Sequence, residues 1–158
     1  MIITAGAYTN KVVKDLGIKL KPTRQLQIWV DPDKDRDQIT EQKMPFAYFF
    51  VNEDMSFYGH AEIEGIGPKG IKFGAMGGVG KRIDPEVDPD NVTEPTKEEV
   101  EALCKEFEVC MPGTKGNVTN VTRCFFVNSP DGHFIVDKLP GYSRVSIGCG
   151  FSGHGFKF

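Results

Sequence analysis

The sequence predicts an α+β fold, in which a mixed, largely antiparallel sheet is accompanied by one long helix late in the chain. Two observations support this class, and a third sets the two ends of the chain apart from it. Short apolar stretches alternate with turn residues, as in antiparallel strands. One stretch, residues 97–110, has helical periodicity with a start and a stop signal. Both ends of the chain resemble buried parallel-sheet strands that are followed by glycine.

Composition limits the class of protein. The chain has 158 residues, 39% of them hydrophobic and 12 of them Phe, which is enough for a buried core. The 19 basic and 22 acidic residues give a net charge of −3, which excludes the clustered basic excess of a nucleic-acid-binding protein. There is no apolar run of membrane-spanning length and no basic signal-peptide start. We therefore expect an intracellular protein without nucleic-acid or membrane partners.

The strands are predicted from β-branched and aromatic stretches bounded by turn residues. A short helix over residues 9–16 is expected to end at Gly17. Residues 52–54 are turn residues that join two strands as a hairpin, and Ser-Pro-Asp-Gly at 129–132 is a second turn. The expected strands are residues 1–5, 25–30, 46–51, 55–58, 70–74, 123–127, 134–136 and 144–147.

The helix over residues 97–110 has the clearest signals in the chain. Thr96 at the N-cap and Glu99 three residues later form a capping-box pattern. Pro112 with the glycine after it ends the helix. The apolar stripe that faces the core consists of Val100, Leu103 and Phe107.

The four cysteines contain no C-x-x-C pair, so their spacing does not indicate a zinc or redox motif. Cys104 and Cys110 lie in or beside the helix and are expected to be small apolar groups. Cys124 follows Arg123, and it is either a core cysteine or a thiolate that a neighbouring cation activates. Cys149 is the fourth.

Three further features have both a structural and a functional interpretation. Lys72 alternates with two bulky apolar residues, so it is either a solvated lysine or a cation that points into a cleft. His154 and Lys157 stand among glycines, either as surface residues or as an anion site. The pattern Gly148-x-Gly150-x-x-Gly153 matches a dinucleotide fingerprint, but neither a helix nor an acidic residue follows it.

Several motifs occur together in the order found in one family, and with them the whole chain resembles the monomeric sarcosine oxidase group of flavin-dependent amine oxidases. The motifs are Gly6-Ala7-Tyr8-Thr9, Pro22-x-Arg24-Gln25, Gly70-Ile71-Lys72-Phe73-Gly74, Ile83-Asp84-Pro85, Met111-Pro112-Gly113, Arg123-Cys124, the run from Ser129 to Asp137 and the run from Gly150 to Phe158.

The resemblance implies oxidation of the secondary amine of N-methyl or cyclic amino acids, with FAD as cofactor and O₂ as acceptor, to an imine and hydrogen peroxide. It implies that Cys124 carries the flavin through a thioether and that Lys72 acts beside the reactive edge of the flavin. It implies that Lys157 binds the substrate carboxylate and that Tyr58 lines the substrate pocket. The remaining flavin contacts that it implies are Gly6, Gly153, His154, Gly155 and Phe156.

Two positions depart from the family pattern. Met76 stands where members often have a histidine, and Phe126 stands where sarcosine oxidases have a tyrosine. These substitutions remove hydrogen-bonding groups, and a more apolar pocket suits a larger N-alkyl amino acid.

The resemblance also implies a division of the chain. Residues 1–17 correspond to a strand and helix of the FAD-binding domain, residues 18–142 to the substrate domain, and residues 143–158 to a returning strand with the flavin-contact motif. In the family, the FAD-binding β-α-β unit lies upstream of the motif at Gly6. We therefore expect a portion of an oxidase, in the cytoplasm or the peroxisome, whose partner is the missing FAD-binding half. The alternative is a non-catalytic truncated substrate-binding or partner module that lacks its own FAD site.

Overall fold

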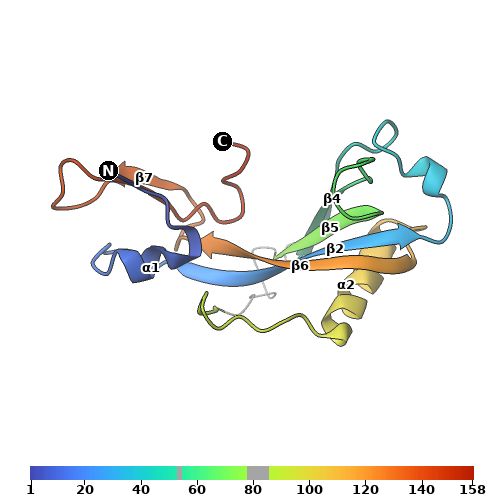
Figure 1. Ribbon diagram of the computed structural model, residues 1–158, viewed down its shortest axis with the longest axis horizontal. Coiled ribbons are helices and arrows are strands. Elements are labelled where there is room, and N and C mark those ends of the chain that lie inside the picture. Colours follow the sequence, from blue (N-terminus) through green and yellow to red (C-terminus); the bar gives the residue numbers. More distant parts are fainter. Residues whose placement is uncertain (53–54, 78–85) are drawn as a thin grey trace. The chain divides into compact units, whose positions relative to one another are not determined.

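The computed structural model of the chain describes residues 1–52, 55–77 and 86–158. The chain forms two compact units, and it passes between them more than once (Figure 1). The hairpin turn expected at 52–54 lies partly outside the described residues, and the motif at 83–85 lies wholly outside them. Unit 1 comprises Met1–Arg24, Pro85–Thr93 and Phe125–Phe158, and unit 2 comprises Gln25–Asp84 and Glu94–Cys124.

Unit 2 is built around a five-stranded sheet with the order β3-β4-β5-β2-β6. The pairs β3–β4, β4–β5 and β5–β2 are antiparallel, as the sequence predicts. A short 3₁₀ helix, η2 (Arg36–Gln38), follows β2. The strands of the sheet are β2 (Lys21–Pro32), β3 (Ala47–Asn52), β4 (Met55–His60), β5 (Ile71–Gly77) and β6 (Gly116–Asn128).

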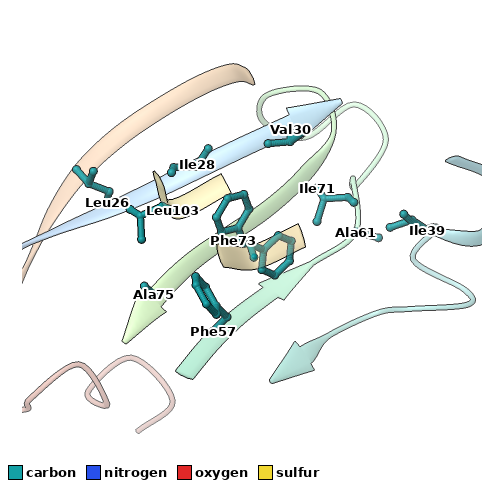
Figure 2. Packing of buried hydrophobic residues seen from close by; sticks show 11 residues of the cluster. Leu26, Ile28, Val30, Ile39, Phe57, Ala61, Ile71, Phe73, Ala75 and Leu103 are labelled. Atoms are coloured by element: carbon teal, nitrogen blue, oxygen red, sulfur yellow. The ribbon is translucent and has the colours of Figure 1, made fainter. Parts of the chain in front are cut away.

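The hydrophobic core of unit 2 lies on one face of this sheet. Alternate residues of three strands point to that face, so that Ile28, Phe57 and Phe73 are at most 1% exposed. Figure 2 shows the labelled side chains gathered there beside Leu103, which α2 (Lys97–Cys110) contributes. The helix therefore covers the core face and leaves the opposite face of the sheet for other contacts.

The helix α2 has the bounds that the sequence predicts. The backbone N–H of Glu99 donates to the Thr96 hydroxyl at 3.2 Å, and the Thr96 N–H donates to the Glu99 carboxylate at 2.8 Å. The helix ends where the N–H of Met111 donates to the carbonyl of Phe107, because Pro112 cannot continue the hydrogen-bond ladder. The predicted capping box is confirmed.

Replacing Thr96 with alanine is expected to lower the free energy of unfolding by about 1 kcal/mol, because the capping hydroxyl is lost. Urea unfolding followed by circular dichroism measures the change. Lys97→Ala, in the next residue, removes a side chain that is 83% exposed and is expected to cost less than about 0.5 kcal/mol. Equal losses in the free energy of unfolding for the two variants would contradict a stabilising role for the Thr96 cap.

Unit 1 contains a three-stranded sheet with the order β1-β8-β7. The strands β1 (Ile2–Ile3) and β8 (Ser146–Cys149) run parallel, and β7 (Ile135–Lys138) pairs antiparallel with β8. A 3₁₀ helix, η1 (Gly6–Tyr8), leads into α1 (Thr9–Val12). The buried residues of this core are Leu16, Leu20, Ile147 and Cys149. No helix among the described residues is long and apolar enough to span a membrane.

The α+β class is confirmed, and several expected boundaries are corrected. The buried strand expected over residues 1–5 is only the two-residue β1, and Ile2 in it is 77% exposed. The helix expected over 9–16 ends at Val12, because Val13 is extended (φ −119°, ψ 92°) and packs against the core of unit 1. The strand expected over 123–127 is part of the 13-residue β6. The strand expected over 144–147 begins two residues later, because the N–H of Val145 donates to the carbonyl of Tyr142 in the preceding turn.

Candidate functional site

The sheet face opposite to the core of unit 2, called the site face below, carries two cross-strand rows of side chains. They come from the positions of β2, β4 and β5 that alternate with the buried core residues. The register aligns three residues in each row. The first row is Gln27, Gly74 and Tyr58, and the second is Trp29, Lys72 and His60. Two of the predicted site residues, Tyr58 and Lys72, therefore lie on the same face.

Tyr58 lies across the backbone of β5. A Cβ atom at Gly74 would be 2.6 Å from the Tyr58 hydroxyl oxygen and 2.7 Å from ring carbon Cζ, so the space above Gly74 is filled by the phenol. Gln27 of β2 lies beyond Gly74 in the same row. Burial raises the pKa of Tyr58 above its ordinary value, and the side chain of Gln27 offsets part of that rise.

Lys72 lies over the ring of Trp29, with Nζ 5.3 Å from the ring centroid. This is the distance range of a cation–π contact, which holds the ammonium group near the sheet. Lys72 faces away from the core, because its neighbours Ile71 and Phe73 are each 1% exposed. The structure thus places a half-buried cation on the site face.

Cys124, near the end of the unit 2 part of β6, is coupled electrostatically to both residues. Burial raises the pKa of the Cys124 thiol, and the positive charge of Lys72 opposes that shift. The thiolate in turn raises the pKa of Tyr58. All four cysteines are free thiols, so Cys124 keeps its nucleophilic sulfur. The structure brings Tyr58, Lys72 and Cys124 together in unit 2.

Replacing Lys72 with methionine is expected to raise the pKa of Cys124 further, since the lowering charge is removed. Less thiolate is then present at pH 8, and alkylation of Cys124 by iodoacetamide is expected to slow roughly threefold. Peptide mass spectrometry resolves this site from the other cysteines. Lys105→Met, which removes an exposed lysine of α2, is the matched control, and equal rates in both variants would refute the coupling.

The other six predicted site residues belong to unit 1. Gly6 has a φ of +52° and turns the chain from β1 into η1. At Gly153 (φ +83°) and Gly155, an added Cβ atom would lie 2.9 and 2.8 Å from the side chains of Phe126 and Phe151. The backbone of this segment is therefore packed closely against aromatic rings. Gly153, His154, Phe156 and Lys157 are exposed.

Four residues of the site face were not identified as site residues from the sequence: Gln27, Trp29, His60 and Gly74. The available signal was the alternation in Gln25-Leu26-Gln27-Ile28-Trp29, which places two glutamines and the tryptophan on one side of a strand. Among the described residues, no group of three or more His, Cys, Asp or Glu side chains could hold a metal ion.

Comparisons with known proteins agree with one another. The family model for FAD-dependent oxidoreductases (DAO) matches residues 1–158. The peroxisomal sarcosine oxidase of Mus musculus is 32% identical over 99% of this chain and 40% of its own length. The N-methyl-L-tryptophan oxidase of Salmonella heidelberg is 30% identical over 99% of this chain and 39% of its own length.

A solved structure supports the fold. L-proline dehydrogenase from P. horikoshii superimposes with a TM-score of 0.71 at 19% identity, covering 98% of this chain and 38% of the dehydrogenase chain. The chain thus spans about 40% of the length of the curated relatives that it matches. Since the family model covers every residue, the chain belongs to the family of FAD-dependent oxidoreductases.

Proposed function

We propose that the chain is the substrate-facing portion of an oxidase that acts on the secondary amine of N-methyl or cyclic amino acids. The observation that carries this proposal is the grouping of Tyr58 and Lys72 on one face of a sheet, with Cys124 close enough for its charge to affect Tyr58 and for the charge of Lys72 to affect its thiol. A thiol, a cation and a phenol beside an indole ring form a set suited to holding a flat, electron-accepting ring and a small substrate.

The side chains of the site face fit a flavin. Cys124 offers a sulfur nucleophile with a cation nearby, and Trp29 offers an aromatic surface. Cys124 is the residue that would hold the flavin through a thioether, and O₂ would be the oxidant that takes up the two electrons and two protons released when the sulfur–carbon bond forms.

When bound, FAD supplies the acceptor that takes a hydride equivalent from the amine and passes two electrons to O₂. The amine loses two electrons and two protons to become an imine, which water hydrolyses, and O₂ becomes hydrogen peroxide. Lys72 acts as a catalytic residue, because its ammonium group stabilises the negative charge that develops on O₂. The contact with Trp29 keeps that ammonium group near the sheet.

Recognition of the substrate is proposed for two residues. Tyr58 lines the pocket, and Lys157 binds the carboxylate, for which a lysine ammonium is a suitable partner. Met76 lies on β5 and Phe126 on β6, and neither offers a strong hydrogen bond to a polar substrate. We therefore propose an N-alkyl amino acid larger than sarcosine, which agrees with similarity to an enzyme named for N-methyl-L-tryptophan.

The ends of the chain are proposed to complete a flavin-binding domain. Residues 1–17 and 143–158 contribute the strand β1, the strand β8 and the flavin contacts, while residues 18–142 form the substrate domain. The parallel pairing of β1 with β8 supports this division, because parallel strands are typical of sheets in which crossover helices cover both faces. The contacts proposed for the flavin ring are Gly6, Gly153, His154, Gly155 and Phe156.

The remaining FAD-binding half is the proposed partner, and it would supply the phosphate-binding part of the cofactor site. The proposed location is the cytoplasm or the peroxisome, because one of the similar enzymes is named as peroxisomal.

Incubation of the purified chain with FAD tests the proposal. After acid precipitation, the flavin absorbance is expected to remain with the protein, and Cys124→Ala is expected to lose it. Cys110→Ala, which removes a half-buried thiol of α2, is the control and is expected to retain the flavin. Retention of flavin by Cys124→Ala would contradict attachment at this cysteine. A precipitate without flavin from the unaltered chain would mean that the missing FAD-binding half is required for attachment.

A further inference from the structure

The glycine-rich segment at the end of unit 1 begins with a turn over residues 151–154. The N–H of His154 donates to the carbonyl of Phe151 at 2.8 Å and closes this turn. Its two central residues, Ser152 and Gly153, have φ angles of +49° and +83°, as in a type I′ turn. Such a turn favours Asn, Asp or Gly at its first central position, because other side chains are strained at positive φ. A serine there therefore depends on stabilising contacts from its own side chain.

The side chain of Ser152 makes those contacts. Its hydroxyl donates to the carbonyl of Gly150 at 3.2 Å and accepts from the backbone N–H of Ser129 at 3.3 Å. The two serine hydroxyl oxygens are 3.5 Å apart. Because Ser129 lies 23 residues earlier in the sequence, these contacts tie the turn over residues 151–154 to the turn at residues 129–132.

Ser129 is itself held firmly. It is 7% exposed, and its single hydroxyl proton is shared between the carbonyl of His133 at 2.8 Å and Asp131 Oδ1 at 3.1 Å. The same Asp131 oxygen accepts from the N–H of His133 at 3.0 Å. The hydrogen bond from His133, together with the one from Ser129, lowers the pKa of Asp131, so its carboxylate stays charged and accepts both. Asp131 thereby braces the turn that holds Ser129.

The glycine that follows Ser152 reports on the position of the turn. An added Cβ atom at Gly153 would lie 2.9 Å from the ring of Phe126, so the backbone of Gly153 lies directly against that ring. Gly153 and His154 are nevertheless exposed. One side of the turn is thus packed on an aromatic ring, and the other side is open to a ligand.

We infer that Ser152 and Ser129 form a clasp, braced by Asp131, that fixes the exposed turn at Gly153 and His154 in the orientation in which it meets a ligand. The three residues of the clasp are positioning residues, and all their contacts lie within unit 1. That the ligand is a flavin rests on the function proposed above, whereas the clasp itself does not.

Proton NMR of the flavin-free chain tests the clasp through the Cα protons of Gly153. Because these protons lie against the ring of Phe126, we expect its ring current to displace their signals. Ser152→Gly tolerates the positive φ but removes the hydroxyl. It is therefore expected to fold and to move the Gly153 signals towards those of an unstructured glycine. Ser143→Gly, at an exposed position before β8, is the matched control and is expected to leave them unchanged.

Two variants of Asp131 test the brace. Asp131→Ala is expected to move the Gly153 signals in the same direction as Ser152→Gly. Asp131→Asn keeps an oxygen that can accept from Ser129 and His133, and it is expected to give the signals of the parent chain. If Asp131→Asn matches Asp131→Ala instead, the hydrogen-bonding role of Asp131 is contradicted. Gly153 signals that stay unchanged in Ser152→Gly, or that move equally in Ser143→Gly, would overturn the inference.

Addition of FAD separates this inference from the proposed function. If the Gly153 signals of the parent chain respond to FAD, Ser152→Gly is expected to bind FAD roughly tenfold more weakly, because a turn that is not fixed must be ordered on binding. Equal affinities would overturn the presentation of the turn to a flavin. A parent chain whose Gly153 signals ignore FAD, although they depend on Ser152 and Asp131, contradicts flavin contact by this segment in the chain alone and leaves the clasp established.

Discussion

Replacing Phe107 with alanine is expected to destabilise unit 2 by about 3 to 5 kcal/mol, one of the two largest effects predicted for this chain. Phe107 is 2% exposed and lies at the centre of an aromatic cluster. Its ring stacks on Phe73 with centroids 4.0 Å apart, and it lies 5.5 Å from Phe57 and 6.1 Å from Phe49. An alanine would leave a cavity between α2 and the sheet that these rings have no means of filling.

The free energy of unfolding in urea measures this loss. Val109→Ala is the matched control, because Val109 lies on the same helix but is 79% exposed, and its expected change is within about 0.5 kcal/mol. The far-ultraviolet circular dichroism of Phe107→Ala is expected to be retained at low urea concentration. A loss below about 1.5 kcal/mol would mean that the helix is held to the sheet by other contacts.

The long helix could be predicted to the residue, because all its determinants are local. Thr96 and Glu99 are three residues apart, the apolar stripe repeats within one helix, and Pro112 ends it. The strands β2 to β5 were also predictable, though β2, β4 and β5 are longer than their apolar stretches and β3 is shifted by one residue. Their ends are fixed by pairing with a neighbour, which a single strand does not reveal.

The elements that could not be predicted depend on distant parts of the chain. The strand β6 begins at Gly116, seven residues before the apolar stretch at 123–127, because polar residues such as Asn117 and Thr119 extend the strand. The helix α1 is shorter than its pattern suggests, since Val13 packs in an extended conformation against the core of unit 1. In both cases tertiary packing overrides local propensity.

The site was only partly predictable. The alternation around Lys72 predicts that it faces away from Ile71 and Phe73, and the structure confirms this orientation. The contact between Lys72 and Trp29 was not predictable, because it depends on the register of β2 against β5. The roles of Lys72, Tyr58 and Cys124 come from the family resemblance and stay predictions. What the structure adds is that the three residues lie near one another in unit 2.

Replacing Gly70 with alanine is expected to destabilise unit 2 by about 3 to 5 kcal/mol, the sum of two separate costs. Gly70 has a φ of +100°, a conformation that is unfavourable for alanine. Its added Cβ would also lie 2.2 Å from the backbone oxygen of Val30. Because Val30 pairs with Ile71 at the start of β5, the two strands would have to move apart at the point where their pairing begins.

Replacing Gly65 with alanine measures the cost of the backbone conformation without the cost of the collision. Gly65 has a similar positive φ of +74°, but nothing lies within 4 Å of an added Cβ, so Gly65→Ala is expected to cost only about 1 kcal/mol for the backbone conformation. Urea unfolding of both variants gives the difference directly. Since that difference isolates the collision with Val30, two equal values would mean that β2 and β5 can separate at this end without loss of stability.

The pairing of these strands also aligns the row of Gln27, Gly74 and Tyr58. A Gly70→Ala chain that folds is therefore expected to have a disturbed Tyr58 titration, whereas Gly65→Ala is expected to titrate as the parent chain does.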